Sequence, residues 1–242
     1  MSEFCVEFRQ VSQFFGDQSV FEHLDLQLPQ QKVTALIGPS GCGKSTLLQM
    51  MNGLVWPQAG EVRVLGAPLD RQRLSEQRRS MGYAVQHIGL FPHWTVRRNM
   101  SVMAALEGWS PERQAARLDK LLDFMQLDAA LLDRYPHQIS GGQAQRVGLC
   151  RAMFLDPPLL LLDEAFSAVD PITKIEVHAR FQAIQAEEPR SVVLVTHDMQ
   201  EALKLADWLV VLGPGAVLQM GTPEQIQTQP AHPQVARLLE AQ

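Results

Sequence analysis

Short continuous runs of hydrophobic residues alternate along this chain with stretches of helical periodicity. The runs VTALI, LLLL and SVVLV begin at Val33, Leu159 and Ser191. Uninterrupted apolar runs of this length are typical of central strands that are buried on both faces of a parallel sheet. Helical patterns follow the runs near residues 45–52, 172–187 and 199–206. Strands alternating with helices predict an α/β fold with a mostly parallel sheet.

The beginning of the chain has a different pattern, which alternates as in an antiparallel sheet. Strands are predicted at Phe4–Phe8 and Val20–Leu28, with Gly16-Asp17 as a turn between them. Shorter strands are predicted at 61–65 and 82–85, and WLVVL and AVLQM near the C-terminus indicate a closing strand pair. Thr222 followed by Pro223 is a typical start of a short helix. We therefore expect an N-terminal antiparallel β subdomain beside the parallel sheet.

Between about Arg97 and Asp133 no strand pattern is found. The segments MSVMAALEG and RLDKLLDFM have helical periodicity instead. This predicts an α-helical insert over residues 88–144, placed between two parts of one core at 1–87 and 145–242. The whole chain, 1–242, is then expected to be a single domain.

Composition excludes several classes of function. The chain has 242 residues and a net charge of -5, so no general positive field favours nucleic acid as a partner. The densest basic stretch, residues 71–79, is interpreted as a solvated helix face. Three cysteines lack metal-ligand or CxxC spacing, the N-terminus has no signal-peptide pattern, and no apolar run approaches the roughly 18 residues of a membrane span. A membrane role would therefore depend on a partner.

A glycine-rich loop follows the first buried strand. Its residues match G-x-x-x-x-G-K-[ST] at every fixed position: Gly38, Pro39, Ser40, Gly41, Cys42, Gly43, Lys44 and Ser45, with Thr46 next. Glycines let successive N–H groups curl around an anion, and the following helix directs its positive end at the phosphates. Lys44 supplies a mobile charge for the outer phosphates, and the Ser45 hydroxyl suits Mg²⁺. The sequence therefore predicts a nucleoside triphosphate site.

Acidic residues end the second buried run. Asp163 at a strand tip can reach Mg²⁺, while the adjacent Glu164 can polarise a water molecule as general base. His197 ends the third run and can donate to the γ-phosphate. The alternatives are a helix cap for the acids and a polar strand end for the histidine, but a phosphate loop on the same sheet favours catalysis.

A further motif, Ile139-Ser140-Gly141-Gly142-Gln143 followed by Gln145-Arg146, closely resembles the LSGGQ signature of ABC ATPases. The phosphate loop, Gln86, the two acids, the run 167–170 and His197 occur in the order of that family. From the residues alone, Ser140 is a good N-cap and the two glycines leave a helix N-terminus open to an anion.

The resemblance implies roles for further residues. It implies that ATP and Mg²⁺ are bound in a head-to-tail dimer, where Ser140, Gly141, Gly142, Gln143 and Asp170 of one copy contact the nucleotide of the other. Phe15 would stack on adenine, although a core aromatic is the alternative. Gln86 would contact Mg²⁺ or water. Ala165 and Arg98 depart from the family pattern, and the Arg97-Arg98 pair would lie near the membrane partner.

The resemblance is to the importer branch. Tyr135-Pro136-His137-Gln138, residues 86–93 and Asp170-Pro171-Ile172-Thr173-Lys174 are similar to ATPase subunits for glycine betaine and choline, and amino-acid importers share much of this pattern. The expected partners are an integral membrane permease, a second ATPase subunit, expected as a homodimer or else a related subunit, and indirectly an extracytoplasmic substrate-binding protein. We expect a peripheral location on the cytoplasmic face of the membrane and no C-terminal regulatory domains. The alternatives are a soluble ABC-type ATPase with a regulatory or mechanical role and a P-loop kinase.

Overall fold

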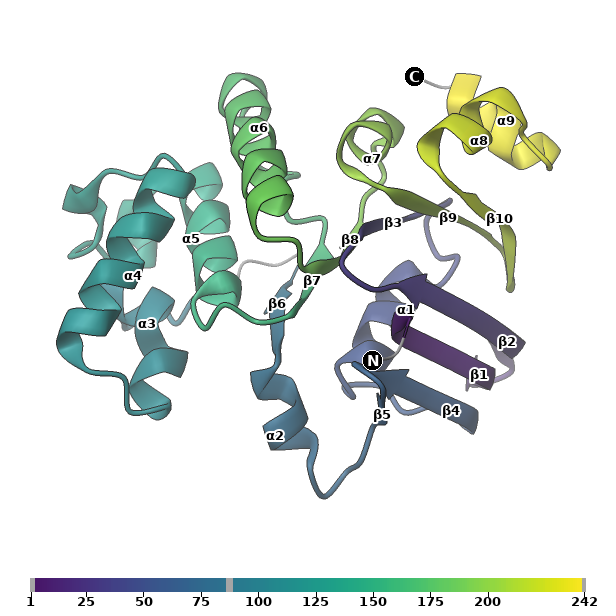
Figure 1. Ribbon diagram of the computed structural model, residues 1–242, viewed down its shortest axis with the longest axis horizontal. Helices are drawn as coiled ribbons and strands as arrows, with labels where there is room; N and C mark the ends of the chain where they lie inside the picture. Colours follow the sequence, from purple (N-terminus) through teal and green to yellow (C-terminus); the bar gives the residue numbers. More distant parts are fainter. Residues whose placement is uncertain (1–2, 86–88, 241–242) are drawn as a thin grey trace. The chain divides into compact units, whose positions relative to one another are not determined.

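The computed structural model describes residues 3–85 and 89–240, which divide into two compact units (Figure 1). Unit 1 comprises Met1–Ser80 and Arg190–Gln242, and unit 2 comprises Met81–Pro189. Each unit contains both strands and helices, as an α/β fold requires. The chain therefore leaves unit 1 once and returns to it once.

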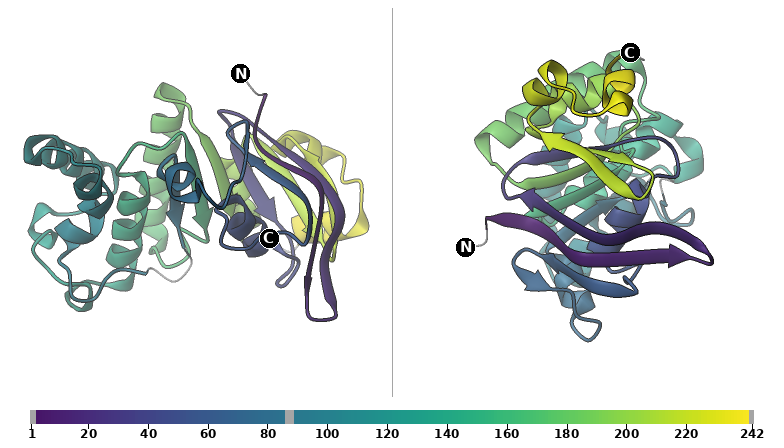
Figure 2. Two further views of the ribbon diagram at one scale, coloured as in Figure 1. Left: turned by 90° about the horizontal axis from the view of Figure 1, so that it is seen from below. Right: turned by 90° about the vertical axis from the view of Figure 1, so that its right-hand side faces the viewer.

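Unit 1 holds a long antiparallel hairpin that Figure 2 shows edge-on and face-on. Its strands are β1 (Phe4–Phe15) and β2 (Gln18–Pro29), which pair with β4 (Ala59–Val64) and β5 (Ala67–Pro68) in the order β2-β1-β4-β5. The prediction that the first strand ends at Phe8 is wrong. The register shifts between Phe8 and Val11, and Gln10 has a φ of 50°. This bulge interrupts the alternation of side chains, so the second half of β1 does not continue the pattern of the first.

A second group of strands forms the mostly parallel part of unit 1. They occur in the order β10-β9-β3-β8, with bounds β3 (Val33–Ile37), β8 (Ser191–Val195), β9 (Trp208–Gly213) and β10 (Ala216–Gly221). Both β8 and β9 pair with β3 in parallel, and β10 closes the edge antiparallel to β9, as predicted. All five residues of β3 and of β8 are buried, in agreement with their continuous apolar runs.

Helices complete unit 1. They are α1 (Lys44–Met51), α2 (Leu74–Arg79), α7 (Met199–Leu205), α8 (Pro223–Thr228) and α9 (Pro233–Glu240). Thr222 caps α8 by accepting from the Gln225 N–H, which confirms the predicted helix start. The helix α9 was not predicted, and its Val235 is fully buried in one cluster with Ile226 and Ala202. The basic stretch before and within α2 is mostly exposed, as predicted, although Arg78 donates to the Asn52 carbonyl at 2.9 Å.

Unit 2 is mainly helical. It contains β6 (Met81–Ala84) and β7 (Leu159–Asp163), which pair in parallel, and the helices α3 (Val96–Leu106), α4 (Pro111–Phe124), α5 (Gly141–Met153) and α6 (Pro171–Glu187). Two 3-10 turns lie at Ala129–Leu131 and Pro136–Gln138. No strand occurs among the described residues from 89 to 158, which is consistent with the predicted helical insert. Thr95 and Ser110 cap α3 and α4 through their hydroxyls.

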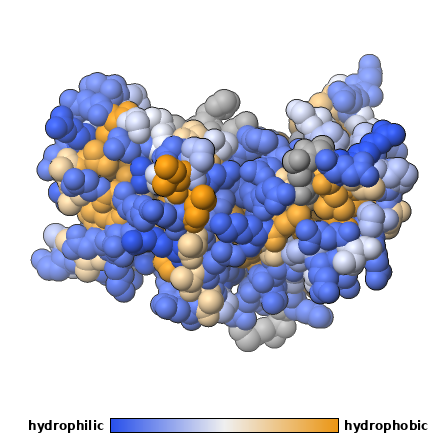
Figure 3. Space-filling model, turned by 90° about the horizontal axis from the view of Figure 1, so that it is seen from above, coloured by the Kyte–Doolittle hydropathy of each residue, from blue (hydrophilic) through white to orange (hydrophobic). Residues whose placement is uncertain are grey.

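Within residues 3–85 and 89–240, no helix combines the length and the apolar character needed to cross a bilayer. On the face seen in Figure 3, hydrophobic residues form separate groups among mostly hydrophilic ones.

Gly82 lies where β6 passes close to α5, and this contact predicts a stability defect. A Cβ at residue 82 would lie 2.1 Å from the Ala152 carbonyl oxygen, a backbone atom that cannot rotate away. We expect Gly82→Ala to lower the free energy of unfolding by about 1–3 kcal/mol, the usual cost of overpacking. Urea denaturation checks this. Gly141→Ala is the matched control, because a Cβ there meets nothing within 4 Å, and an equal loss in both variants would contradict the explanation.

Candidate functional site

The predicted phosphate loop lies at the end of β3, in unit 1. A Cβ on Gly38 would lie 2.3 Å from the Leu212 carbonyl oxygen, so only glycine fits against β9. Gly43 has a φ of 100°, a conformation that glycine adopts without strain, and it precedes α1 with no side-chain cap. Gly43 has no side chain that could cap α1. The helix start is therefore suited to binding an anion through its first N–H groups.

Lys44 is buried and its ammonium group lies inside this loop. The Nζ atom donates to the Gly38 carbonyl at 2.8 Å and to the Pro39 carbonyl at 2.9 Å. It also lies 3.8 Å from the Cys42 sulfur. A buried charge is stable only with partners of this kind, and phosphate oxygens are stronger acceptors than carbonyls. The side chain is thus already at the loop where outer phosphates would lie.

His197 is brought to the same edge of unit 1. In the parallel pairing of β3 and β8, Leu36 lies opposite Val195. Gly38 and His197 each come two residues after these partners, so they leave the sheet at the same level. His197 is exposed, and Asp198 behind it caps α7 by accepting from the Glu201 N–H at 3.1 Å. The structure therefore places this histidine beside the phosphate loop, because both leave neighbouring strands at their carboxyl ends.

Phe15 lies apart from the core at the end of β1. Its side chain is 53% exposed, next to the turn at Gly16. The ring is therefore not a core aromatic, which was the alternative interpretation from the sequence. An exposed aromatic face is available for stacking against a planar base.

In unit 2, the two acids end β7. Asp163 is only 5% exposed, whereas Glu164 is half-buried. Burial raises the pKa of the Tyr83 hydroxyl to about 12, and the negative charge of Asp163 adds to that shift. Tyr83 thus stays protonated beside the buried carboxylate, and the motif patterns of the sequence did not single it out. Gln86, the other predicted residue of this edge, lies outside the described residues.

The backbone of Glu164 is in an unusual conformation. Its φ is 48°, in the left-handed region that costs about 1–3 kcal/mol for a residue other than glycine. The Glu164 carbonyl oxygen accepts from Gln145 Nε2 at 2.9 Å, from Ser167 Oγ at 2.8 Å and from the Ser167 N–H at 3.1 Å. A strained residue held by several donors is typical of functional positions.

The signature motif begins α5 in unit 2. Ser140 accepts from the Gln143 N–H at 3.2 Å, and Gln143 Oε1 accepts from the Ser140 N–H at 2.9 Å, which together form a capping box. This confirms the predicted N-cap. Gly141 has open space around it, and Gly142 lies against the Ala168 carbonyl. The helix start is therefore well ordered, while the glycine surface remains accessible to an anion.

Asp170 caps α6 on the same unit. Its carboxylate accepts from the Thr173 N–H at 3.0 Å, and this hydrogen bond holds the pKa of Asp170 below its usual range. The side chain is exposed and ionised at neutral pH. Within a single chain, the Asp170 side chain acts as the N-cap of α6.

An aromatic and cationic surface, formed by Phe91, His93, Trp94 and Arg98, lies at the start of α3. The Phe91 and Trp94 ring centroids are 4.2 Å apart, and the Arg98 guanidinium lies 4.3 Å over the Trp94 ring. Buried Asn99 holds this surface in place by accepting from the Phe91 N–H at 2.8 Å. Phe91 itself is 42% exposed. Exposed aromatic and arginine side chains are enriched at protein interfaces.

The donor set was compared with the needs of a bound metal. Within the described parts of the chain, no group of three or more His, Cys, Asp or Glu residues is arranged to hold an ion. Mg²⁺ commonly binds through one or two protein ligands together with phosphates and water. Buried Asp163 and the hydroxyl of Ser45 in the first turn of α1 fit that chemistry.

The chain was then compared with known proteins. Residues 21–167 match the family described as ABC transporter. The chain is 45% identical over 227 residues to the glycine betaine uptake system ATP-binding protein YehX of Escherichia coli (strain K12), covering 94% of this chain and 74% of that protein. It is 41% identical over 228 residues to the glycine betaine/carnitine/choline transport ATP-binding protein OpuCA of Bacillus subtilis (strain 168), covering 94% of this chain and 60% of that protein.

A solved structure has the same fold. The dimeric post-hydrolysis state of the ATP-binding cassette MJ0796, bound to ADP and Pi, superposes with a TM-score of 0.83 at 28% identity, covering 90% of this chain and 98% of that one. The family match and this structure confirm the predicted P-loop ATPase fold and the resemblance to ABC ATPases.

The loop geometry predicts a binding defect. A Cβ on Gly43 would lie 2.5 Å from the Phe21 ring, and its φ of 100° is strained for alanine. We expect Gly43→Ala to weaken ATP binding at least about tenfold, because the N–H groups of the loop turn away from the phosphates, a loss of about 1.4 kcal/mol or more. Fluorescent-nucleotide titration measures this. Gly215→Ala is the control, since its φ of 74° carries similar strain in the β9–β10 turn without a clash, and equal affinities for the two variants would argue against the model of the loop.

Proposed function

This chain belongs to the ABC transporter family, and we propose that it is the ATP-hydrolysing subunit of an importer for glycine betaine, choline or a related solute. The ATPase activity is supported by the phosphate loop on unit 1 and by the acid pair Asp163-Glu164 on unit 2. The solute class is supported by relatives at 41–45% identity whose names state glycine betaine or choline transport. The observation that carries the proposal is Glu164 itself, a half-buried carboxylate held in a strained conformation at a strand end.

The proposed roles follow from the chemistry of each side chain. The loop 38–43, Lys44, Ser45 and Thr46 bind the phosphates, and Phe15 stacks on adenine. Ser45, Asp163 and Gln86 would hold Mg²⁺, which when bound would neutralise the charge that develops on the phosphates. Glu164 accepts a proton from the attacking water, while His197 donates to the γ-phosphate and fixes the geometry.

The second anion site requires a second subunit. In this proposal the helix start at Ser140–Gln143 does not bind the nucleotide held by the phosphate loop of the same subunit. It covers the nucleotide of a partner ATPase subunit, and Asp170 crosses the interface. We propose a homodimer closed by ATP and opened by hydrolysis. Such a cycle couples binding energy to a two-state movement. A related subunit in place of a second copy gives the same geometry.

The membrane side of the proposal depends on the aromatic and cationic surface. We propose that Phe91, His93, Trp94 and Arg98 contact an integral permease, with Arg97 beside them, so that the chain is peripheral on the cytoplasmic face of the membrane. An extracytoplasmic binding protein would deliver the solute to that permease, and amino acids are the second solute class. The proposed domain organisation is a nucleotide-binding core of 1–87 and 145–242 with a helical insert at 88–144. Nucleic acid is not among the proposed partners.

Glu164 provides the direct test of hydrolysis. We expect Glu164→Gln to lower ATP turnover by about 10²–10⁴, the usual worth of a general base, with ATP affinity retained. Light scattering should then show a dimer in MgATP and a monomer without it. Glu187→Gln, the same change at the exposed end of α6, should leave both properties as in the parent. Turnover at the parental rate in Glu164→Gln removes this residue from the proposed role.

The partner is tested by isolation from membranes. We expect the parent chain to co-purify with a multi-helix membrane protein in stoichiometric amount, and Phe91→Asp to lose it while keeping ATPase activity, because a charge on that aromatic surface opposes burial. Leu106→Asp is the control, as Leu106 is 73% exposed elsewhere on unit 2. A parent chain that brings down no membrane protein, with or without ATP, favours the soluble regulatory alternative.

A further inference from the structure

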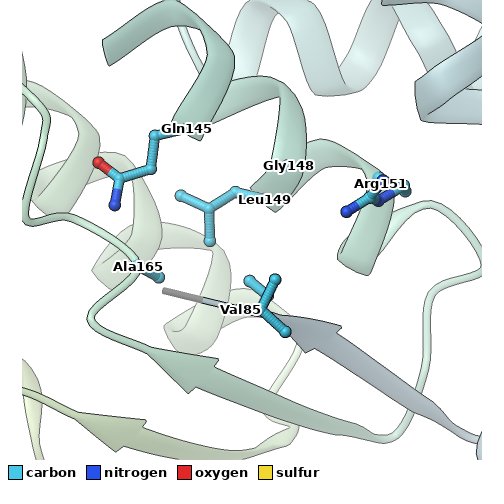
Figure 4. A pocket seen from close by; sticks show the side chains of 7 residues that line it. Val85, Gln145, Gly148, Leu149, Arg151 and Ala165 are labelled. Atoms are coloured by element: carbon cyan, nitrogen blue, oxygen red, sulfur yellow. The ribbon is translucent and has the colours of Figure 1, made fainter. Parts of the chain in front are cut away.

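Gln145 connects α5 with the turn that follows β7 in unit 2. Its side chain is only 5% exposed and extends from α5 toward the loop that follows β7 (Figure 4). The Nε2 group donates to the Glu164 carbonyl at 2.9 Å and to Ser167 Oγ at 3.3 Å. The Oε1 atom accepts from the Ala168 N–H at 2.7 Å. The amide side chain of Gln145 thus forms hydrogen bonds with both ends of the turn at 164–168.

These bonds determine the orientation of the Glu164 peptide group. Two donors come from Ser167, inside the turn itself, and the third comes from Gln145 on a different element. Turn bonds alone can shift together with the turn, whereas the bond from Gln145 ties it to a helix of unit 2. Because Glu164 has a left-handed φ, rotation of its peptide group toward an ordinary conformation would swing its side chain away.

The position of Gln145 on α5 links this turn to the signature. Gln145 lies five residues after Ser140, the residue that caps α5. Gly142, on the first turn of the helix, also lies against the turn, since a Cβ there would be 3.0 Å from the Ala168 carbonyl. The start of α5 and the segment 164–168 therefore pack as one piece, and movement of the helix start is passed to the Glu164 backbone.

We propose that Gln145 is a positioning residue for hydrolysis. It acts by holding the Glu164 peptide group so that the carboxylate points in the direction that proton abstraction requires. It also couples the signature helix, and hence the partner's nucleotide bound there, to the general base of its own subunit. This inference rests on the proposed role of Glu164.

The first experiment compares kcat with ATP affinity. We expect Gln145→Leu, which keeps the volume but cannot donate, to lower kcat about 10- to 100-fold, since misplacement of a catalytic group by about 1 Å costs up to about 10²-fold. ATP affinity should stay as in the parent, because the phosphate loop is on unit 1. Gln114→Leu is the matched control, as its Nε2 also donates to a backbone carbonyl of unit 2, that of Trp109, at 2.8 Å. Parental kcat in Gln145→Leu overturns the proposal.

The second experiment repeats Gln145→Leu in the Glu164→Gln protein. A residue that acts through the general base has no further effect once that base is absent, so residual hydrolysis should be the same with and without the second change. An equal fold-loss in both backgrounds would show that Gln145 only supports the fold or acts elsewhere, and would overturn the inference. If Glu164→Gln by itself hydrolyses at the parental rate, the proposed function of Glu164 fails instead, which is a separate result.

Ser167→Ala serves where Gln145→Leu does not fold. Ser167 is exposed, and the change removes the Oγ donor to the same carbonyl together with the weaker 3.3 Å bond that Oγ accepts from Gln145, while the Gln145 bond to the Glu164 carbonyl stays. We expect a smaller loss of kcat, with ATP affinity unchanged and with the same absence of effect in the Glu164→Gln background. A parental kcat for Ser167→Ala, with Gln145→Leu unfolded, would count against the view that this carbonyl needs external donors.

Discussion

The complete burial of the central strands is the constraint on which the rest of the structure depends. Every residue of β3, β7 and β8 is buried, so none of these strands can carry a solvated polar side chain along its length except at its end. Polar chemistry is thereby confined to the carboxyl ends, where Gly38, Asp163 and His197 are found. The hydrophobic effect that stabilises each unit thus also decides where nucleotide chemistry is possible.

Backbone conformation at those ends is the second requirement. Gly38 and Gly43 allow approaches that a side chain would block, and Gly43 adds a positive φ without strain. Glu164 adopts a positive φ although it is not glycine. Its conformation persists since three donors hold its carbonyl. The phosphate loop is thus unstrained because glycines occupy its positions of positive φ, whereas the turn at Glu164 is strained and held by hydrogen bonds.

The polar features divide between the two compact units. The phosphate loop and His197 belong to unit 1, whereas the acids, the signature and Asp170 belong to unit 2. A dimeric cassette in a post-hydrolysis state is among the solved structures with a similar fold.

Local sequence patterns were sufficient to predict the buried strands, the phosphate loop, the acid pair and the signature helix. Each is coded by a local pattern, either a continuous apolar run or glycines and polar residues at fixed spacing. Local patterns also gave the caps at Ser140 and Thr222. They did not predict the second half of β1, because a bulge at Gln10 breaks the alternation of side chains. They also missed α9, which packs on a core built from residues distant in the sequence.

The hydrogen bonds between the polar residues depend on how the elements pack in three dimensions. Gln145 and Glu164 are 19 residues apart, and their hydrogen bond exists because α5 packs beside the turn after β7. The exposure of Phe15 and the burial of Lys44 were likewise undetermined by their neighbours in sequence. Spacing along the chain specifies which groups are present and on which element. Their distances and orientations arise from packing between elements, which no local pattern encodes.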